Sequence, residues 1–307
     1  MTPVQHYVFT VFTGRGGGAQ TTAFLNRTVP GCWAANEFPE YVPTLPGRLG
    51  RWQHRFHRRF IETHELLGRG EVIKAFVRGD DDYIEKVVRR RMKLVEEEAA
   101  RRGATIYVDV TKFFARGLHR GIIRTIPRFS LLFMVRNPLT NMRSFLNRRK
   151  NFPLDNNRPG DRCNVLRLDD ADMEKGELYL WMWCELHLRF QELARLPNVE
   201  RTATIRTEAM NDANVWRHTL DGLHLPHLGI EIAPPPNRNV ALGYGETQVS
   251  ADDARLFERF VRRLPVDVRR RLTYLDDFDP WQSVEKKQGS TPAPATGTVA
   301  KQLGASS

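Results

Sequence analysis

HYVFTVFTGRGGGAQTT, residues 6–22, is the stretch that determines the fold class of this chain. Its first part is rich in β-branched and aromatic residues and holds no strand breaker, which predicts a buried strand over 6–13. The glycine run at 14–18 is poor in both helix and strand and predicts a loop. The residues that follow predict a helix over 20–28, which opens with a pair of threonines.

Strands and helices alternate along the rest of the chain. Further strands are expected at 32–36, 106–110, 129–135 and 202–206, and helices at 51–75, 82–102, 139–150, 175–195, 213–223 and 250–264. This alternation predicts an α/β fold of three layers, with a central parallel sheet and helices on both of its faces. We expect a single domain over 1–282. Residues 283–307 are rich in Gly, Ser, Thr, Pro and Ala, which predicts a disordered tail.

The composition is that of a globular protein with an excess of positive charge. Of its 307 residues 41% are hydrophobic, and the net charge is +11. That charge favours an anionic partner such as a nucleotide, a sulfated or phosphorylated substrate, a nucleic acid or a membrane surface. The three cysteines lie far apart without C-x-x-C spacing, so we expect reduced thiols, no zinc site and a cytoplasmic location. No signal peptide is recognisable and no apolar run approaches the ~20 residues that span a bilayer, which predicts a soluble protein.

The glycine loop has the chemistry of a phosphate site. A helix start offers unpaired N–H groups and about half a positive charge, and glycines let the backbone approach an anion closely. The cation of Arg15 and the hydroxyls of Thr21 and Thr22 lie at the two ends of this loop. In the ATPase pattern G-x-x-x-x-G-K-[ST] the lysine is replaced here by Gln20, which argues against ATP or GTP hydrolysis. The alternative is a flexible glycine loop without a ligand.

A second polar group follows the most apolar strand. Arg136 directly follows the apolar run 131–135, and Ser144 lies eight residues further on in the next predicted helix. The carboxyl ends of parallel strands are where open α/β sheets bind ligands. An arginine fork with a serine hydroxyl suits a phosphate dianion.

These segments in this order resemble the two cofactor segments of the P-loop sulfotransferases, in particular the bacterial and Golgi-type members. In that family the first segment holds the 5′-phosphosulfate of 3′-phosphoadenosine-5′-phosphosulfate (PAPS), and the second holds its 3′-phosphate. The stretches NEFP (36–39), YVDVTKF (107–113) and IRTE (205–208) are also similar to family segments. The resemblance implies a P-loop nucleotide-binding architecture, PAPS as co-substrate, 3′-phosphoadenosine-5′-phosphate (PAP) as product, and no metal.

The resemblance assigns cofactor contacts residue by residue. Arg136 and Ser144 correspond to the 3′-phosphate segment, and Arg238 lies in a stretch similar to the glycine-rich loop that closes on that phosphate in cytosolic members. The loop after the first strand is about three residues longer than the usual R-S-G-T-T, so Arg15 and Gln20 remain alternative contacts for the sulfonate. The residues that correspond to the 5′-phosphosulfate segment are Arg15, Gly16, Gly17, Gly18, Ala19, Gln20, Thr21 and Thr22.

Sulfuryl transfer is an in-line displacement at sulfur that depends on positioning and electrostatics. The resemblance implies Glu37 as the general base for the acceptor, with Glu40 as the alternative. Glu37 could instead be a solvated acid or an ion-pair partner of Arg15. We also expect Arg15 and Lys112 to act on the sulfonate or the leaving oxygen, although a surface role for Lys112 is equally compatible with the sequence.

Two other classes of function remain as alternatives. A P-loop small-molecule kinase is disfavoured by Gln20 in the lysine position. A nucleic-acid binder is suggested by the arginine runs 89–91 and 269–271 but carries no known nucleic-acid motif. The acceptor is expected to be a small molecule or a carbohydrate, and the arginines between 48 and 59 favour an anionic one unless they serve only solubility. The sequence does not determine the oligomeric state.

Overall fold

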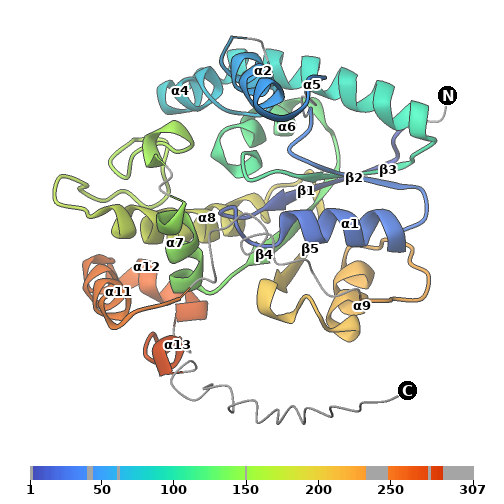
Figure 1. The fold of residues 1–307 in the computed structure, drawn as a ribbon. Helices are drawn as coiled ribbons and strands as arrows, with labels where there is room; N and C mark the ends of the chain where they lie inside the picture. Colours follow the sequence, from blue (N-terminus) through green and yellow to red (C-terminus); the bar gives the residue numbers. More distant parts are fainter. Residues whose placement is uncertain are drawn as a thin grey trace, which may run out of the picture.

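The computed structural model describes residues 3–39, 44–60, 63–148, 151–232, 248–275 and 278–285. Its centre is a parallel five-stranded sheet with the strand order β2-β3-β1-β4-β5 (Figure 1). The strands are β1 (His6–Val11), β2 (Cys32–Asn36), β3 (Ile106–Val110), β4 (Phe129–Val135) and β5 (Val199–Arg206). The chain adds β2 and β3 on one side of β1 and then β4 and β5 on the other. The topological switch point therefore lies between β1 and β4.

Helices cover both faces of the sheet, which confirms the predicted three-layer α/β fold (Figure 1). Adjacent residues of a strand point to opposite faces. Accordingly, Val8 packs toward one layer and Phe9 toward the other. The first layer contains α1 (Gly18–Thr28) and α9 (Ala213–Gly222). The second contains α4 (Glu71–Arg78), α5 (Asp81–Arg102), α6 (Leu118–Thr125), α7 (Pro138–Asn147) and α8 (Lys175–Leu193).

The helix expected over 51–75 is interrupted. In its place the structure has α2 (Gly47–Phe60), α3 (Thr63–Leu66) and α4. Gly68 and Gly70, before α4, have φ angles of +84° and +57°, and such left-handed residues end helices. The helix α6 was not predicted.

The C-terminal part adds α11 (Ala251–Arg263), α12 (Val266–Arg271) and α13 (Gln282–Glu285). The last helix extends across the boundary expected at 283, and residues 286–307 lie outside the described part of the chain. Within the described ranges, none of the helices is both long and apolar enough to cross a bilayer.

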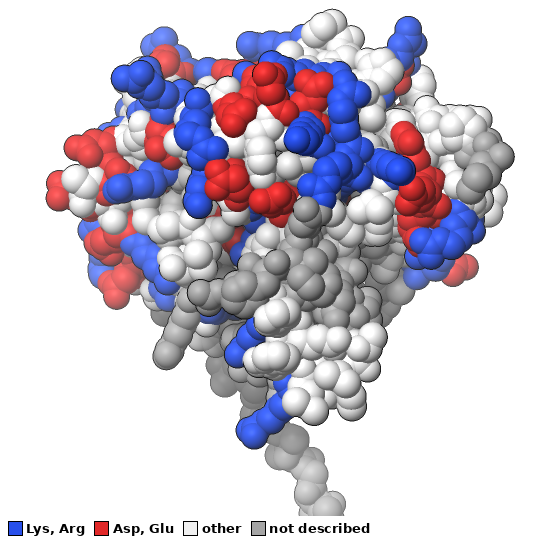
Figure 2. Space-filling view, turned by 90° about the horizontal axis from the view of Figure 1, so that it is seen from above, with Lys and Arg blue, Asp and Glu red and all other residues white. Residues whose placement is uncertain are grey.

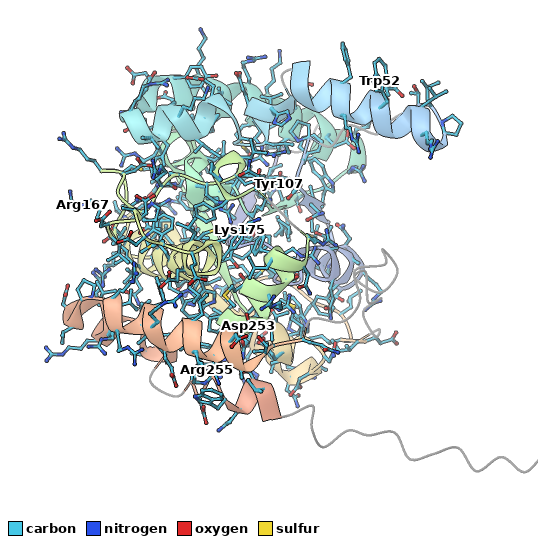
Figure 3. All side chains as sticks on the ribbon, turned by 60° about the vertical axis from the view of Figure 1, so that its left-hand side comes forward. Trp52, Tyr107, Arg167, Lys175, Asp253 and Arg255 are labelled. Atoms are coloured by element: carbon cyan, nitrogen blue, oxygen red, sulfur yellow. The ribbon has the colours of Figure 1, made fainter. Side chains whose placement is uncertain are left out.

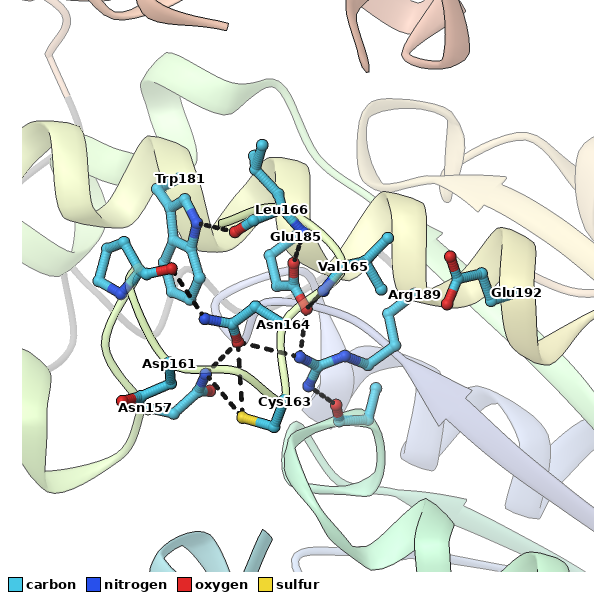
Figure 4. A network of polar contacts seen from close by, with 12 residues as sticks. Asn157, Asp161, Cys163, Asn164, Val165, Leu166, Trp181, Glu185, Arg189 and Glu192 are labelled. Atoms are coloured by element: carbon cyan, nitrogen blue, oxygen red, sulfur yellow. Dashed lines mark hydrogen bonds and ion pairs between the residues drawn. The ribbon is translucent and has the colours of Figure 1, made fainter. Parts of the chain in front are cut away.

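The polar segment at 151–172 is held against α8 by buried side chains (Figure 4). The Glu185 carboxylate accepts hydrogen bonds from the backbone N–H groups of Val165 (3.1 Å) and Leu166 (2.7 Å). The indole of Trp181 donates to the Leu166 carbonyl at 2.9 Å, and Arg189 forms an ion pair with Glu185. These contacts hold the segment 151–172 in place, although it contains no strand. Asp155, which belongs to this segment, contacts Lys112 in the site described next.

Candidate functional site at the carboxyl edge of the sheet

All five strands run in the same direction, so the segments that follow them meet at one edge of the sheet. Four of these segments carry predicted site residues: the glycine loop after β1, Glu37 after β2, Lys112 after β3 and Arg136 after β4. The structure therefore brings together residues that are up to about 120 positions apart in the sequence. Open α/β sheets bind ligands at this edge, next to the switch point.

The glycine loop folds into a tight turn ahead of α1. Gly14, Arg15 and Gly17 have φ angles of +87°, +60° and +88°. The helix begins at Gly18, and its first turn carries no acidic side chain. Its first N–H groups have no carbonyl partner within the helix, and no carboxylate in that turn offsets the positive end of the helix dipole. The loop thus leads into a helix N-terminus of the kind that can bind an anion.

Asn141 of α7, the helix that follows β4 on the other side of the switch point, forms hydrogen bonds with this loop. Its side-chain oxygen accepts a hydrogen bond from the Thr13 hydroxyl at 3.0 Å, and its amide donates to the Gly14 carbonyl at 2.9 Å. Asn141 is fully buried. The β1 loop and α7 therefore hold a fixed position relative to each other.

The two predicted cofactor segments contact each other directly. Arg15 Nε donates to the Ser144 hydroxyl oxygen at 3.1 Å, and Arg136 Nη1 donates to the Arg15 carbonyl at 2.6 Å. Burial lowers the pKa of Arg136, against the opposing effect of the nearby Glu208 carboxylate. Two guanidinium groups and one hydroxyl are thus gathered where β1 and β4 end, in an arrangement that can bind a phosphate group.

A second cationic cluster lies on the β3 side of the loop. The Asp155 carboxylate accepts a hydrogen bond from Lys112 Nζ at 2.8 Å and forms an ion pair with Arg69 at 2.6 Å, and its backbone carbonyl accepts from Arg116 at 3.0 Å. Burial alone would raise the pKa of Asp155, but the charges of Lys112, Arg69 and Arg116 hold it well below its usual range. Burial lowers the pKa of Lys112 and lowers that of Arg116 to about 10. Three cations thus surround one carboxylate.

This second cluster is connected to the glycine loop. Arg116 donates a hydrogen bond to the Thr13 carbonyl, directly before the loop. The side chain of Lys112 passes so close to Gly14 that a Cβ atom there would lie 3.0 Å from Lys112 Cδ. Glu37 contributes as well, because its charge acts to raise the pKa of both Lys112 and Arg116. Glu37, the predicted base, and Lys112 therefore lie close enough for their charges to interact.

Glu37 is positioned by its backbone and by a buried ion pair behind it. Its N–H donates to the Val110 carbonyl at 3.2 Å, and its φ angle is +55°. Arg91 forms two hydrogen bonds with Asp109, at 2.7 and 2.9 Å, and donates to the Phe38 carbonyl. Asp109 and Arg91 are both fully buried. Asp109, which alternates with apolar residues in its strand, thus supports the segment after β2 from the interior.

Some predicted site residues use their polar groups elsewhere. The Thr21 hydroxyl is buried against the sulfur atoms of Met134 and Met210, and the Thr22 hydroxyl donates to the Gly18 carbonyl at 2.9 Å. The Gln20 amide donates to Asn211. Glu40 and Arg238 lie outside the described residues.

Several residues of this site were not predicted from the sequence. Asn141 could have been found, because it lies three positions before Ser144 and therefore on the same face of α7. Thr207 donates to the Gly16 carbonyl at 3.1 Å and directly follows β5. Asp155, Arg69 and Arg116 gave no local signal, because only the fold places them beside Lys112.

The arginine run 89–91 does not form a continuous basic surface. Arg89 pairs with Glu85 at 2.6 Å, whereas Arg91 is the buried partner of Asp109. Figure 2, which looks onto the molecule from above, shows lysines and arginines interspersed with acidic side chains over the upper part of this face. Among the described residues, no group of three or more His, Cys, Asp or Glu side chains is arranged to hold a metal ion.

Comparisons with known proteins give structural neighbours only. No family model and no curated protein matches the chain. The sulfotransferase domain from the Curacin biosynthetic pathway superimposes with a TM-score of 0.49 at 12% identity, over 90% of this chain and 99% of that one. The sulfotransferase domain from the Synechococcus PCC 7002 olefin synthase gives 0.46 at 12% identity, over 86% and 98%.

A third neighbour is the sulfotransferase from Alicyclobacillus acidocaldarius, with a TM-score of 0.41 at 13% identity, over 87% of this chain and 99% of that one. All three structures are sulfotransferases or sulfotransferase domains, the class that the sequence motifs resemble.

Proposed function

We propose that the chain is a sulfotransferase that moves a sulfuryl group from PAPS to a hydroxyl or amine of an acceptor. The observation that carries this proposal is the direct contact between Arg15, Ser144 and Arg136 across the switch point. A nucleotide with phosphate groups at both the 5′ and 3′ positions needs two anion sites close together. A helix N-terminus after β1 and an arginine–serine pair after β4 meet that need.

Each residue then has a distinct part. Arg136 and Ser144 bind the 3′-phosphate, and the N–H groups at the start of α1 bind the 5′-phosphosulfate. In the transfer step the acceptor oxygen or nitrogen bonds to sulfur as the bond from sulfur to the 5′-phosphate oxygen breaks. Glu37 takes the acceptor proton, and Lys112 with Arg15 offsets the negative charge that develops on the leaving phosphate.

We assign the acceptor to the side of the site that lies between Glu37 and Asp155 of the segment 151–172. Arg69, Lys112 and Arg116 give this side a net positive charge even with Asp155 present. This charge favours an acceptor that is itself anionic, such as an acidic sugar or another small molecule with a carboxylate or sulfate group.

Titration calorimetry with PAP, AMP and Mg-ATP tests the nucleotide. We expect the wild-type protein to prefer PAP, because only PAP carries the 3′-phosphate. Arg136→Ala should weaken PAP binding by about tenfold to a hundredfold, the range for a lost charge-assisted hydrogen bond, and leave AMP binding nearly unchanged. Arg128→Ala is the matched control, because Arg128 precedes the same strand at its far end and is exposed.

Binding of PAP no tighter than that of AMP or Mg-ATP would contradict the proposal and bring the kinase alternative forward. With PAP binding established, Glu37→Gln separates binding from chemistry. We expect this variant to bind PAP like the wild type and to lose transfer in an acceptor screen with labelled PAPS.

A further inference from the structure

Three apolar side chains of helix α2 lie on the outside of the molecule. Leu49, Trp52 and Phe56 are 63%, 64% and 45% exposed, whereas Gly50 is buried. At about 100° per residue, these three side chains fall within about 60° of one another, and Gly50 lies well away from them on the inner side. A helix of a globular protein normally places its apolar stripe toward the core. This helix does the opposite.

The exposed apolar face is extended and ordered by local contacts. The Gln53 side chain accepts hydrogen bonds from the N–H groups of Thr44 and Leu45, both at 3.1 Å, and so folds the preceding turn onto the helix. Leu45 is itself 45% exposed. Trp52 and Phe56 stack with ring centroids 5.6 Å apart. Figure 3 places Trp52 on α2 at the periphery of the molecule.

The charge of the same helix is entirely positive. Residues 47–60 contain five arginines and no aspartate or glutamate. Arg48 and Arg55 are exposed, and their positions fall beside the apolar stripe on the helical wheel. A continuous apolar stripe bordered by arginines is the pattern of a helix that lies in the plane of a membrane interface.

We propose that α2 docks the protein onto a membrane surface that contains anionic lipids. An anionic sugar or a nucleic acid would pair with the arginines but leave the apolar stripe in water. A lipid interface covers both, because the stripe enters the acyl boundary while the arginines remain among the phosphate groups. This inference does not depend on the proposed transfer reaction.

Flotation with lipid vesicles tests the proposal on the full chain. At low salt we expect the wild type to bind phosphatidylcholine vesicles that contain about 30% phosphatidylserine. It should bind vesicles of pure phosphatidylcholine far more weakly. Binding should fall as sodium chloride rises, because salt screens the arginines. Absence of binding to both vesicle types at low salt would overturn the proposal and assign the face to another class of partner.

Matched variants locate the binding face. Leu49→Asp should lower binding by about tenfold or more, the effect of withdrawing one leucine from lipid, whereas Leu228→Asp should not, although Leu228 is 68% exposed. Replacing Arg48 and Arg55 with glutamine should lower binding by about thirtyfold. The same change at Arg217 and Arg255, exposed on α9 and α11, removes equal charge from elsewhere and should have a much smaller effect.

Equal losses in the members of either pair would also overturn the proposal. Circular dichroism melting of every variant separates lost docking from lost folding. The three positions on α2 and the three control positions are all exposed, so we expect these variants to melt within a few degrees of the wild type.

Discussion

Asp155 determines the electrostatics of the candidate acceptor side. Its carboxylate contacts Lys112 and Arg69, and its backbone contacts Arg116. A buried cation without a counter-charge is strongly unfavourable, because it has lost its hydration and gains no ion pair in return. The Asp155 carboxylate, together with the charge of Glu37, thus offsets the three cations beside the glycine loop.

Asp155→Asn should lower the free energy of unfolding by about 3 kcal/mol at pH 7. The pKa of Asp155 is held below its ordinary value of 3.8 in the folded state, so the stability it supplies is present above that value and is lost as the pH falls through the folded pKa. The difference between variant and wild type should therefore shrink below about pH 4. Urea unfolding from pH 7 down to about pH 2.5 measures it.

Asp161→Asn is the control for this variant, because Asp161 lies in the same segment and accepts a hydrogen bond from the backbone of Arg158. It should cost less than about 1 kcal/mol. A difference between Asp155→Asn and wild type that is constant over the whole pH range would contradict the assigned charge pairing.

At the scale of elements, the turn between β1 and α1 depends on one glycine more than on its neighbour. Gly17 is the N-cap of α1 with φ at +88°, and a Cβ atom there would lie 2.8 Å from Met210 Sδ. Gly16 has ordinary backbone angles, and its Cβ would meet other atoms only at 3.6 Å or more. The two positions differ in conformation and in space, although the sequence reads GGG.

Gly17→Ala should destabilise the protein by about 1–3 kcal/mol, because alanine in the left-handed region is strained and Met210 is too buried to move freely. Gly16→Ala should cost less than about 1 kcal/mol, since it meets only van der Waals contacts. Thermal unfolding of the two variants side by side measures the difference. Equal shifts in melting temperature would show that the turn does not have the geometry described.

At the scale of the whole molecule, two histidines are buried as neutral groups in the helical layer. Burial lowers the pKa of His187 to about 3 and that of His119 well below its ordinary value. The Nδ1–H group of each ring donates a hydrogen bond to a backbone carbonyl oxygen: His187 to that of Trp183 at 2.8 Å and His119 to that of Phe114 at 3.3 Å. Both rings lie in the layer that contains α6 and α8.

We expect the stability to fall as the pH drops below about 6.5. The unfolded chain binds protons at both histidines there, whereas the folded chain does not, so the native state loses about 1.4 kcal/mol per pH unit for each histidine. Urea unfolding at pH 7.5, 6.5 and 5.5 measures the slope. Histidine ring signals in NMR provide a second readout: both rings should stay neutral at pH 5.5, and titration near pH 6.5 in the folded protein would contradict the prediction.

Local sequence was sufficient for the five strands and for most of the helices. The apolar runs predicted all five strands. The glycine loop and Arg136 were predicted as site residues because each directly follows a strand, and Ser144 because it lies in the helix after Arg136. Parallel strands then had to bring these segments to one edge. The uninterrupted helix expected over 51–75 was wrong, because periodicity does not show that Gly68 and Gly70 adopt left-handed angles.

The tertiary structure alone decided which charges meet. Asp155 lies 43 positions from Lys112, in a segment whose place depends on the Glu185–Arg189 pair of α8, and nothing in its neighbours indicates that partner. The outward direction of Leu49, Trp52 and Phe56 on α2 could likewise not be predicted from the sequence, because the same periodicity suits a stripe that faces the core. A sequence pattern fixes which residues share a face, whereas packing against the rest of the chain determines what that face touches.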